Sequence, residues 1–126
     1  MSKKISASFE IKAWDEVTFD EGPDVAKLTR ASVKKHYSGD ITGTSATEWL
    51  MAYAADGSAS FVGIERIKGT LGGLKGSLVL QHVGTFRDGA ATASLTILSG
   101  TAQLERATGS GDFVADPQGS LTLSLD

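Results

Sequence analysis

The sequence predicts an all-β protein in which eight antiparallel strands close into a barrel. Apolar and polar residues alternate along most of the chain, and no window of about 11 residues carries the apolar stripe of a helix. Glycine is abundant, with 15 of 126 residues, whereas proline occurs only 2 times. This composition is typical of short strands joined by tight turns. The length fits a single domain over residues 1–126, and a β-sandwich is the alternative packing of the same strands.

The N-terminal part of the chain is predicted to form two strands separated by a loop. The first strand spans 6–14, and its apolar face carries Phe9, Ile11 and Ala13. The dipeptide Gly22-Pro23 marks the loop. The second strand spans 28–38 and alternates Ala31, Val33 and Tyr37 with Arg30, Ser32, Lys34 and His36. Each of these strands is therefore expected to bury one face and expose the other.

Six further strands are expected, at 46–54, 59–68, 76–87, 90–98, 109–115 and 119–125. The dipeptides Asp56-Gly57 and Asp88-Gly89 lie between such segments and are strong signals for hairpin turns. Gly72-Gly73 is a weaker signal of the same kind. Between the sixth and seventh strands, only residues 104–107 have a sequence compatible with one helical turn.

The turns also predict which side chains face the interior. If all three dipeptides are two-residue loops, Glu48 lies opposite Glu65, and Gly63 lies opposite His82. The strand at 90–98 has Ala, Leu and Ile on one side and Thr and Ser on the other, so its apolar side defines the interior. Glu48, Glu65 and His82 are then expected to point inward, whereas a longer loop at Gly72-Gly73 would turn His82 outward.

A barrel of this size, like a lipocalin, either fills its interior with side chains or holds one small ligand. Five small residues on the predicted interior face favour a cavity: Ala52, Gly63, Gly84, Ala91 and Ala93. We expect a small, largely apolar ligand. The residues expected to contact it are Leu50, Phe61, Gly63, Leu80, Phe86 and Leu95.

Glu48, Glu65 and His82 are the candidate catalytic residues. Directly opposed side chains on paired strands have Cβ atoms about 4.5–5.5 Å apart, so one of two such carboxyl groups needs a raised pKa or a cationic partner. The set could act as a general acid and base in an isomerase- or cyclase-like reaction. The alternatives are a buried polar network, a different register with both carboxyl groups near the rim, or a divalent-metal site. No cofactor is predicted.

The opposite face of the central strands is also apolar, which predicts a homo-oligomer interface. The residues expected there are Trp49, Met51, Tyr53, Val62, Ile64 and Val79. The alternative is that the segment 15–27 covers this face. That segment is acidic and is followed by the basic residues Lys27, Arg30, Lys34 and Lys35, a pattern that we interpret as an exposed loop beside a half-solvated strand. A homo-oligomer without any ligand is a further alternative.

Several classes of protein are excluded or disfavoured by composition. The absence of cysteine excludes disulfide frameworks, cysteine-ligated metals and thiol nucleophiles. No apolar run approaches about 18 residues, and no secretory leader follows the initial Met-Ser-Lys-Lys, so we expect a cytoplasmic protein without membrane contact. A net charge of -3 disfavours a dedicated nucleic-acid binder. The stretch from Gly69 to Ser77 lacks the ending of a phosphate loop.

Several segments, which together span most of the chain, carry a resemblance to a known family. They are 14–16, 28–31, 48–53, 56–63, 65–66 and 76–86, and the most specific is the string Leu80-Gln81-His82-Val83-Gly84-Thr85-Phe86. With them, the chain resembles the bacterial family called domain of unknown function 3224. The resemblance implies an eight-stranded barrel like those of allene oxide cyclase and plant dirigent proteins, which enclose an apolar pocket and assemble as trimers or dimers. It implies no site residues, and the fold alone does not imply cyclase chemistry.

Overall fold

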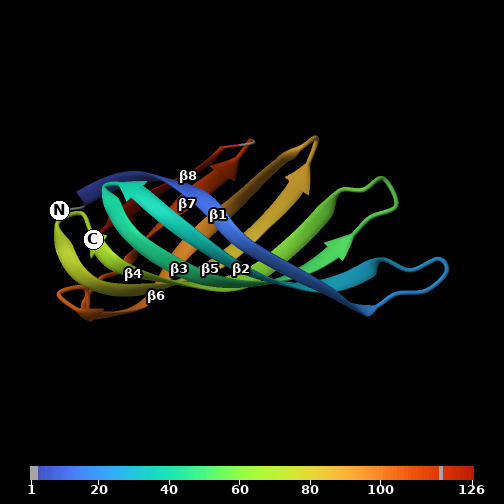
Figure 1. The fold of residues 1–126 in the computed structure, drawn as a ribbon, viewed down its shortest axis with the longest axis horizontal. Coiled ribbons are helices and arrows are strands. Elements are labelled where there is room, and N and C mark those ends of the chain that lie inside the picture. The colour runs from blue at the N-terminus through green and yellow to red at the C-terminus, as the bar shows by residue number, and fades with distance from the viewer. Residues whose placement is uncertain (1–2, 117) are drawn as a thin grey trace.

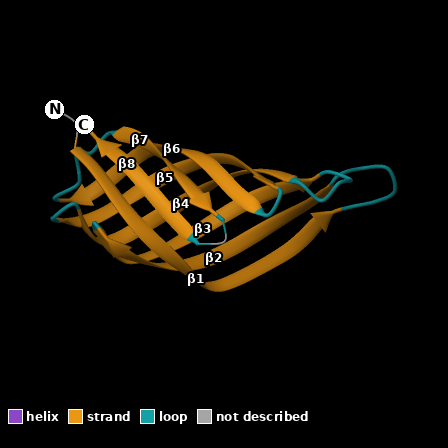
Figure 2. Ribbon diagram, turned by 90° about the horizontal axis from the view of Figure 1, so that it is seen from above, coloured by secondary structure: helices purple, strands orange, loops and turns teal. Residues whose placement is uncertain are grey.

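The computed structural model describes residues 3–116 and 118–126, so residues 1, 2 and 117 of the expected domain lie outside the described residues. Eight strands form a closed antiparallel barrel in which each strand pairs with its neighbours in sequence and β1 pairs with β8 (Figures 1 and 2). The strands are β1 (Lys3–Asp20), β2 (Lys27–Gly39), β3 (Ile41–Tyr53), β4 (Ala59–Leu71), β5 (Leu74–Arg87), β6 (Ala90–Ala102), β7 (Gly109–Ala115) and β8 (Gly119–Leu125). The predicted all-β fold is confirmed. The described chain contains no helix long and apolar enough to cross a membrane.

One end of the barrel is closed by apolar side chains. The turn between β6 and β7 places Leu104 against the core, where it is almost completely buried. This segment forms turns rather than a helix, closed by hydrogen bonds from Leu104 N–H to Thr101 O at 2.9 Å and from Ala107 N–H to Leu104 O at 3.0 Å. The two chain termini lie at the same end (Figure 1).

The other end is open because its hairpins differ in length. β8 pairs with β1 only from Lys3 to Phe9, whereas β1 stays paired with β2 as far as Asp20, with irregularities between Ile11 and Ala13 and between Thr18 and Asp20. The β7–β8 hairpin consequently stops well short of the β1–β2 and β3–β4 hairpins (Figure 1). Part of the segment expected as a loop, residues 15–20, instead extends β1.

Two of the three predicted hairpin registers are confirmed, and one is wrong. Leu71 pairs with Leu74, and Arg87 pairs with Ala90, as two-residue loops require. At the β3–β4 turn, Gly57 N–H donates to Ala54 O at 3.0 Å and Ala54 N–H donates to Ser58 O at 2.8 Å. With Gly57 at a φ of 88°, this is a three-residue loop that ends in a glycine bulge, rather than the expected two-residue turn.

The extra loop residue reverses the orientation of every side chain on β3. Glu65 lies opposite Thr47, and Glu48 lies opposite Ile64. The prediction that Leu50 faces inward is therefore wrong, because its side chain is 52% exposed. Ala52 turns outward with it. The prediction that Trp49 and Met51 face outward is also wrong, because both are buried in the core.

Aromatic rings fill much of the interior space that the small residues were expected to leave empty. A Cβ atom on Gly63 would lie 2.5 Å from Trp49 Cδ1, and a Cβ atom on Gly84 would lie 2.7 Å from Phe61 Cζ. Each glycine therefore makes room for the ring of its cross-strand neighbour. The expected cavity at the level of Gly63 and Gly84 is replaced by packed aromatic side chains.

Candidate functional site

A buried polar cluster lies in the middle of the barrel and is centred on the Glu65 carboxylate of β4. Tyr37 Oη–H donates to Glu65 Oε2 at 2.7 Å, and His82 Nε2 bonds to Glu65 Oε1 at 2.9 Å. Lys35 Nζ lies 3.4 Å from Glu65 Oε2. Glu65, His82 and Lys35 have no exposed side-chain surface, so the cluster is shielded from bulk water.

Trp49 of β3 selects the tautomer of His82. Its Nε1–H donates to His82 Nδ1 at 3.2 Å, which requires a lone pair on Nδ1. The proton of neutral His82 therefore resides on Nε2 and points to Glu65. Trp49 was expected at an outer interface. It belongs to the interior cluster because the side chains of β3 face the opposite way from the prediction.

Lys35 of β2 is a site residue that charge patterning alone misassigned. Its ammonium group lies 4.5 Å from the ring centroid of Phe9, 4.9 Å from that of Trp49 and 5.3 Å from that of Phe113. These three rings form an aromatic cage around a cation. The alternation that places Val33 and Tyr37 inside also places Lys35 inside, and this signal was available in the sequence.

The cluster holds one ion pair and two neutral groups. Although burial opposes ionisation, the nearby Lys35 ammonium and the hydrogen bond from His82 lower the pKa of Glu65 from 4.5 to about 2. Burial lowers the pKa of Lys35, and the Glu65 carboxylate only partly offsets this effect. Burial also lowers the pKa of His82 and, together with Glu65, raises the pKa of Tyr37. At neutral pH the barrel thus contains a Lys35–Glu65 ion pair beside neutral His82 and Tyr37.

These shifts predict a two-stage loss of stability on acidification. As pH falls below 6.5, the unfolded chain protonates its histidine before folded His82 does, so the free energy of unfolding decreases. Below 4.5, protonation of Glu65 in the unfolded chain removes up to about 3 kcal/mol more, which is fully lost below a pH of about 2. Urea unfolding measured across this pH range should show both stages, and His82→Gln should lack the first. An identical pH profile in that variant would contradict the assignment to His82.

Glu48, the third candidate catalytic residue, lies on the outer surface. Its Oε1 accepts hydrogen bonds from Arg30 Nε at 2.8 Å and from Ser32 Oγ at 2.9 Å. These bonds, led by that from Ser32, lower the pKa of Glu48. The predicted pairing of two inward carboxyl groups is therefore wrong. The candidate metal ligands Glu48, Glu65 and His82 are not brought together either, because Glu48 lies outside the barrel. Among the described residues, no group of three acidic or histidine side chains is arranged to hold a metal ion.

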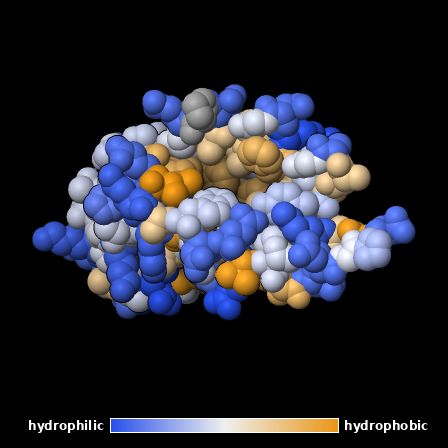
Figure 3. Space-filling view, turned by 45° about the vertical axis from the view of Figure 1, so that its right-hand side comes forward, coloured by the Kyte–Doolittle hydropathy of each residue, from blue (hydrophilic) through white to orange (hydrophobic). Residues whose placement is uncertain are grey.

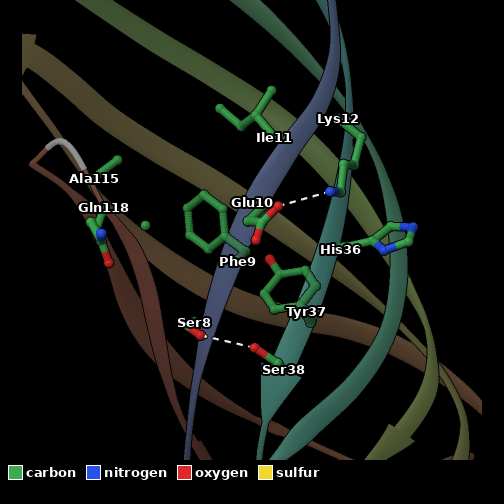
Figure 4. A pocket seen from close by; sticks show the side chains of 11 residues that line it. Ser8, Phe9, Glu10, Ile11, Lys12, His36, Tyr37, Ser38, Ala115 and Gln118 are labelled. Atoms are coloured by element: carbon green, nitrogen blue, oxygen red, sulfur yellow. Dashed lines mark hydrogen bonds and ion pairs between the residues drawn. The ribbon is translucent and has the colours of Figure 1, made fainter.

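A cavity of about 710 Å³ opens where β1 leaves β8. Its wall consists of Ser8, Phe9, Glu10, Ile11, Lys12, His36, Tyr37, Ser38, Ala115, Gln118 and Gly119. We call it the mouth cavity. Figure 3 shows the hollow with apolar side chains inside it, and Figure 4 shows Ala115 and Gln118 across the gap from Phe9 and Ile11. Mixed apolar and polar walls of this kind suit a small ligand with one polar group.

Phe9 and Tyr37 connect the mouth cavity to the buried cluster. Both residues line the cavity, while the Phe9 ring also contacts Lys35 and the Tyr37 hydroxyl bonds to Glu65. The ring of Phe9 packs over Gly119, where a Cβ atom would lie 2.3 Å from Phe9 Cε1. Phe9 and Tyr37 therefore contact both the cavity and the Lys35–Glu65 ion pair.

A second polar group lies farther along β1 at the open end. Glu16 accepts hydrogen bonds from Tyr53 Oη at 2.6 Å, Thr29 Oγ1 at 2.7 Å and Trp14 Nε1 at 3.0 Å. Partial burial alone would raise the pKa of Glu16, but these bonds lower it. Partial burial and the carboxylate together raise the pKa of Tyr53 to about 12. Tyr53, expected at an interface, is instead half-buried and anchors β1 to β3.

The residues expected to contact a ligand occupy three different environments. Phe61, Leu80 and Leu95 are buried in the core, and Gly63 lies beneath Trp49. Leu50 is on the outer surface, and Phe86 is 38% exposed. None of these residues lines the mouth cavity. The cavity is formed instead by residues of β1, β2, β7 and β8, none of which was predicted to contact a ligand.

Residues 5–126 match the family described as Protein of unknown function (DUF3224). The chain belongs to this family. A crystal structure of a protein with unknown function from the DUF3224 family of Shewanella oneidensis MR-1 has 27% sequence identity and a TM-score of 0.80. The similarity covers 100% of this chain and 98% of that one. No match of comparable significance was found among curated proteins.

Proposed function

We propose that this protein binds a small, largely apolar molecule in the mouth cavity. The observation that carries the proposal is an opening of about 710 Å³ whose wall includes Phe9 and Tyr37, two residues that also contact the buried Lys35–Glu65 pair. Its volume lies within the usual range for small-molecule sites, about 300–1,000 Å³. The apolar walls would contact the body of the ligand. Gln118, at the edge of the cavity, would offer a hydrogen bond to its polar group.

Benzyl alcohol is a suitable probe because it has one aromatic ring and one hydroxyl group. Titration followed by amide NMR should give saturable shifts around Phe9, Ile11 and Ala115. Ala115→Trp should abolish these shifts by filling the cavity, whereas Val114→Trp, at an outward-facing neighbour, should leave them unchanged. Binding that is absent, or that is equal in Ala115→Trp, would contradict the proposal.

We also propose that the chain self-associates through an outer apolar row. Leu50, Val62 and Val83 pair across β3, β4 and β5, and their side chains are 52%, 49% and 54% exposed. Ile64 and Phe19 extend the row, and both are also exposed. Three adjacent strands with apolar outer side chains are unusual for a surface in water. A second copy, which brings the same surface, would cover it symmetrically.

Light scattering tests the second proposal. The native protein should have the mass of an oligomer, and Leu50→Glu with Val83→Glu should reduce it to that of a monomer. Thr92→Glu with Ser94→Glu, which adds the same charge to the outer face of β6, is the matched control and should leave the mass unchanged. A monomeric native protein would rule out this interface.

A further inference from the structure

Lys35 is the most unusual side chain of the interior. Its whole side chain is buried, its ammonium group is enclosed by the rings of Phe9, Trp49 and Phe113, and it lies 3.4 Å from a carboxylate. A buried ion pair is not needed for stability, because well-packed apolar residues at such positions are often equally stabilising. The other buried residues on this face of β2 are uncharged: Thr29, Ala31, Val33 and Tyr37. The position therefore points to a reaction that requires an amine.

We propose that Lys35 forms an imine with the carbonyl group of a small aldehyde or ketone bound in the mouth cavity. This inference rests on the proposed function, since the carbonyl compound must first occupy the cavity. The ring of Phe9 is the barrier between the cavity and Lys35 Nζ. Phe9 is held by ring contacts with Tyr37 and Phe113, and this ring must rotate away from them for the carbonyl compound to reach Lys35 Nζ.

The reaction preserves the charge of the buried site. Lys35–NH₃⁺ and the carbonyl compound give the iminium Lys35–NH⁺=C and one molecule of water. The nitrogen lone pair forms the new C–N bond, and the carbonyl oxygen leaves as water. Since the product is also a cation, the Glu65 carboxylate and the three aromatic rings stabilise it as they stabilise the ammonium group.

The cluster also supplies the necessary proton transfers. Glu65 is within reach of Lys35 Nζ, so it can accept the ammonium proton that frees the lone pair. After the attack, a second proton passes from the nitrogen to the former carbonyl oxygen, and Glu65 returns the first proton to the resulting hydroxyl group, which leaves as water. Burial lowers the pKa of Lys35, which favours release of that proton. Two buried hydroxyl groups, Ser45 Oγ and Thr47 Oγ1, have no hydrogen-bond partner among the described residues. They lie opposite Lys35 and Glu65 on the paired strands, so they are placed to bind the reacting oxygen.

Reductive trapping with benzaldehyde and sodium cyanoborohydride tests the inference on the full chain. Peptide mass spectrometry should find a benzyl group on Lys35, and its amount should saturate with benzaldehyde concentration. Benzyl alcohol should compete with the labelling, and Ala115→Trp should abolish it. Lys35→Arg keeps the charge but cannot form the imine, so it should lose the label at this position. Lys34→Arg, which changes the exposed neighbour, is the control and should keep the label on Lys35.

The outcomes separate this inference from the proposed function. If benzyl alcohol binds in the cavity but Lys35 remains unlabelled in the folded native protein, the imine is ruled out and the binding function stands. If benzyl alcohol does not bind either, both proposals fail. Labelling of Lys35 that does not saturate, or that only equals the labelling of exposed Lys34, would also overturn the inference. These readouts come from the native chain and do not depend on the folding of a variant.

Discussion

Replacement of Glu65 by Gln should lower the free energy of unfolding by about 3–5 kcal/mol. The substitution keeps the shape of the side chain but leaves the Lys35 ammonium without a counter-charge in a site with no solvent exposure. Removal of one member of a buried ion pair is costly for this reason. Urea denaturation followed by circular dichroism at neutral pH measures the effect.

Two further variants make this prediction specific. Glu48→Gln removes a carboxylate that is paired with Arg30 on the surface, so its effect should not exceed about 1 kcal/mol. The double variant Lys35→Met with Glu65→Leu removes both buried charges and should recover most of the stability lost in Glu65→Gln. Equal effects of the Glu65 and Glu48 substitutions would contradict the position of Glu65 in the structure.

Replacement of Trp49 by Ala should also destabilise the protein by about 3–5 kcal/mol. Trp49 is 5% exposed and packs against Phe61, Phe113 and His82. The substitution opens a cavity in the aromatic core and leaves His82 Nδ1 without its donor. Thermal and urea unfolding provide the measurement.

The adjacent residue Leu50 is the matched control for Trp49. Its side chain is 52% exposed, so Leu50→Ala should change the free energy of unfolding of the monomer by no more than about 0.5 kcal/mol. The two predictions together test the orientation of β3. A large effect at Leu50 with a small effect at Trp49 would show that the strand faces the other way.

The register of β3 shows where local sequence signals fail. An Asp-Gly pair is compatible with a two-residue turn and also with a three-residue loop that ends in glycine. In this chain, Asp56 Oδ1 accepts hydrogen bonds from Ser58 N at 2.9 Å and Ser58 Oγ at 2.6 Å, which favours the longer loop. The strand itself does not resolve the choice, because both of its faces carry large apolar residues, such as Trp49 and Leu50. In β6, apolar residues alternate with Thr and Ser, which identifies the inner face. β3 lacks this alternation.

The position of Lys35 shows a different failure. The alternation along β2 places it on the same face as Val33 and Tyr37, but its charge and the neighbouring Lys34 suggested a solvated strand. Burial of a lysine requires a counter-charge, and its partner Glu65 lies 30 residues away in the sequence. Nothing local in β2 indicates that this carboxylate is available.

The sequence by itself determined the all-β class, the eight strands, and the two hairpins at Gly72-Gly73 and Asp88-Gly89. These features depend on alternation and turn chemistry, which act over a few residues. Only the tertiary structure decided that Trp49 lies inside, that Lys35 pairs with Glu65, and that a cavity opens beside Phe9. The physical reason is that each depends on groups brought together by barrel closure: a counter-charge from β4, rings from β1 and β7, and a β7–β8 hairpin too short to cover β1.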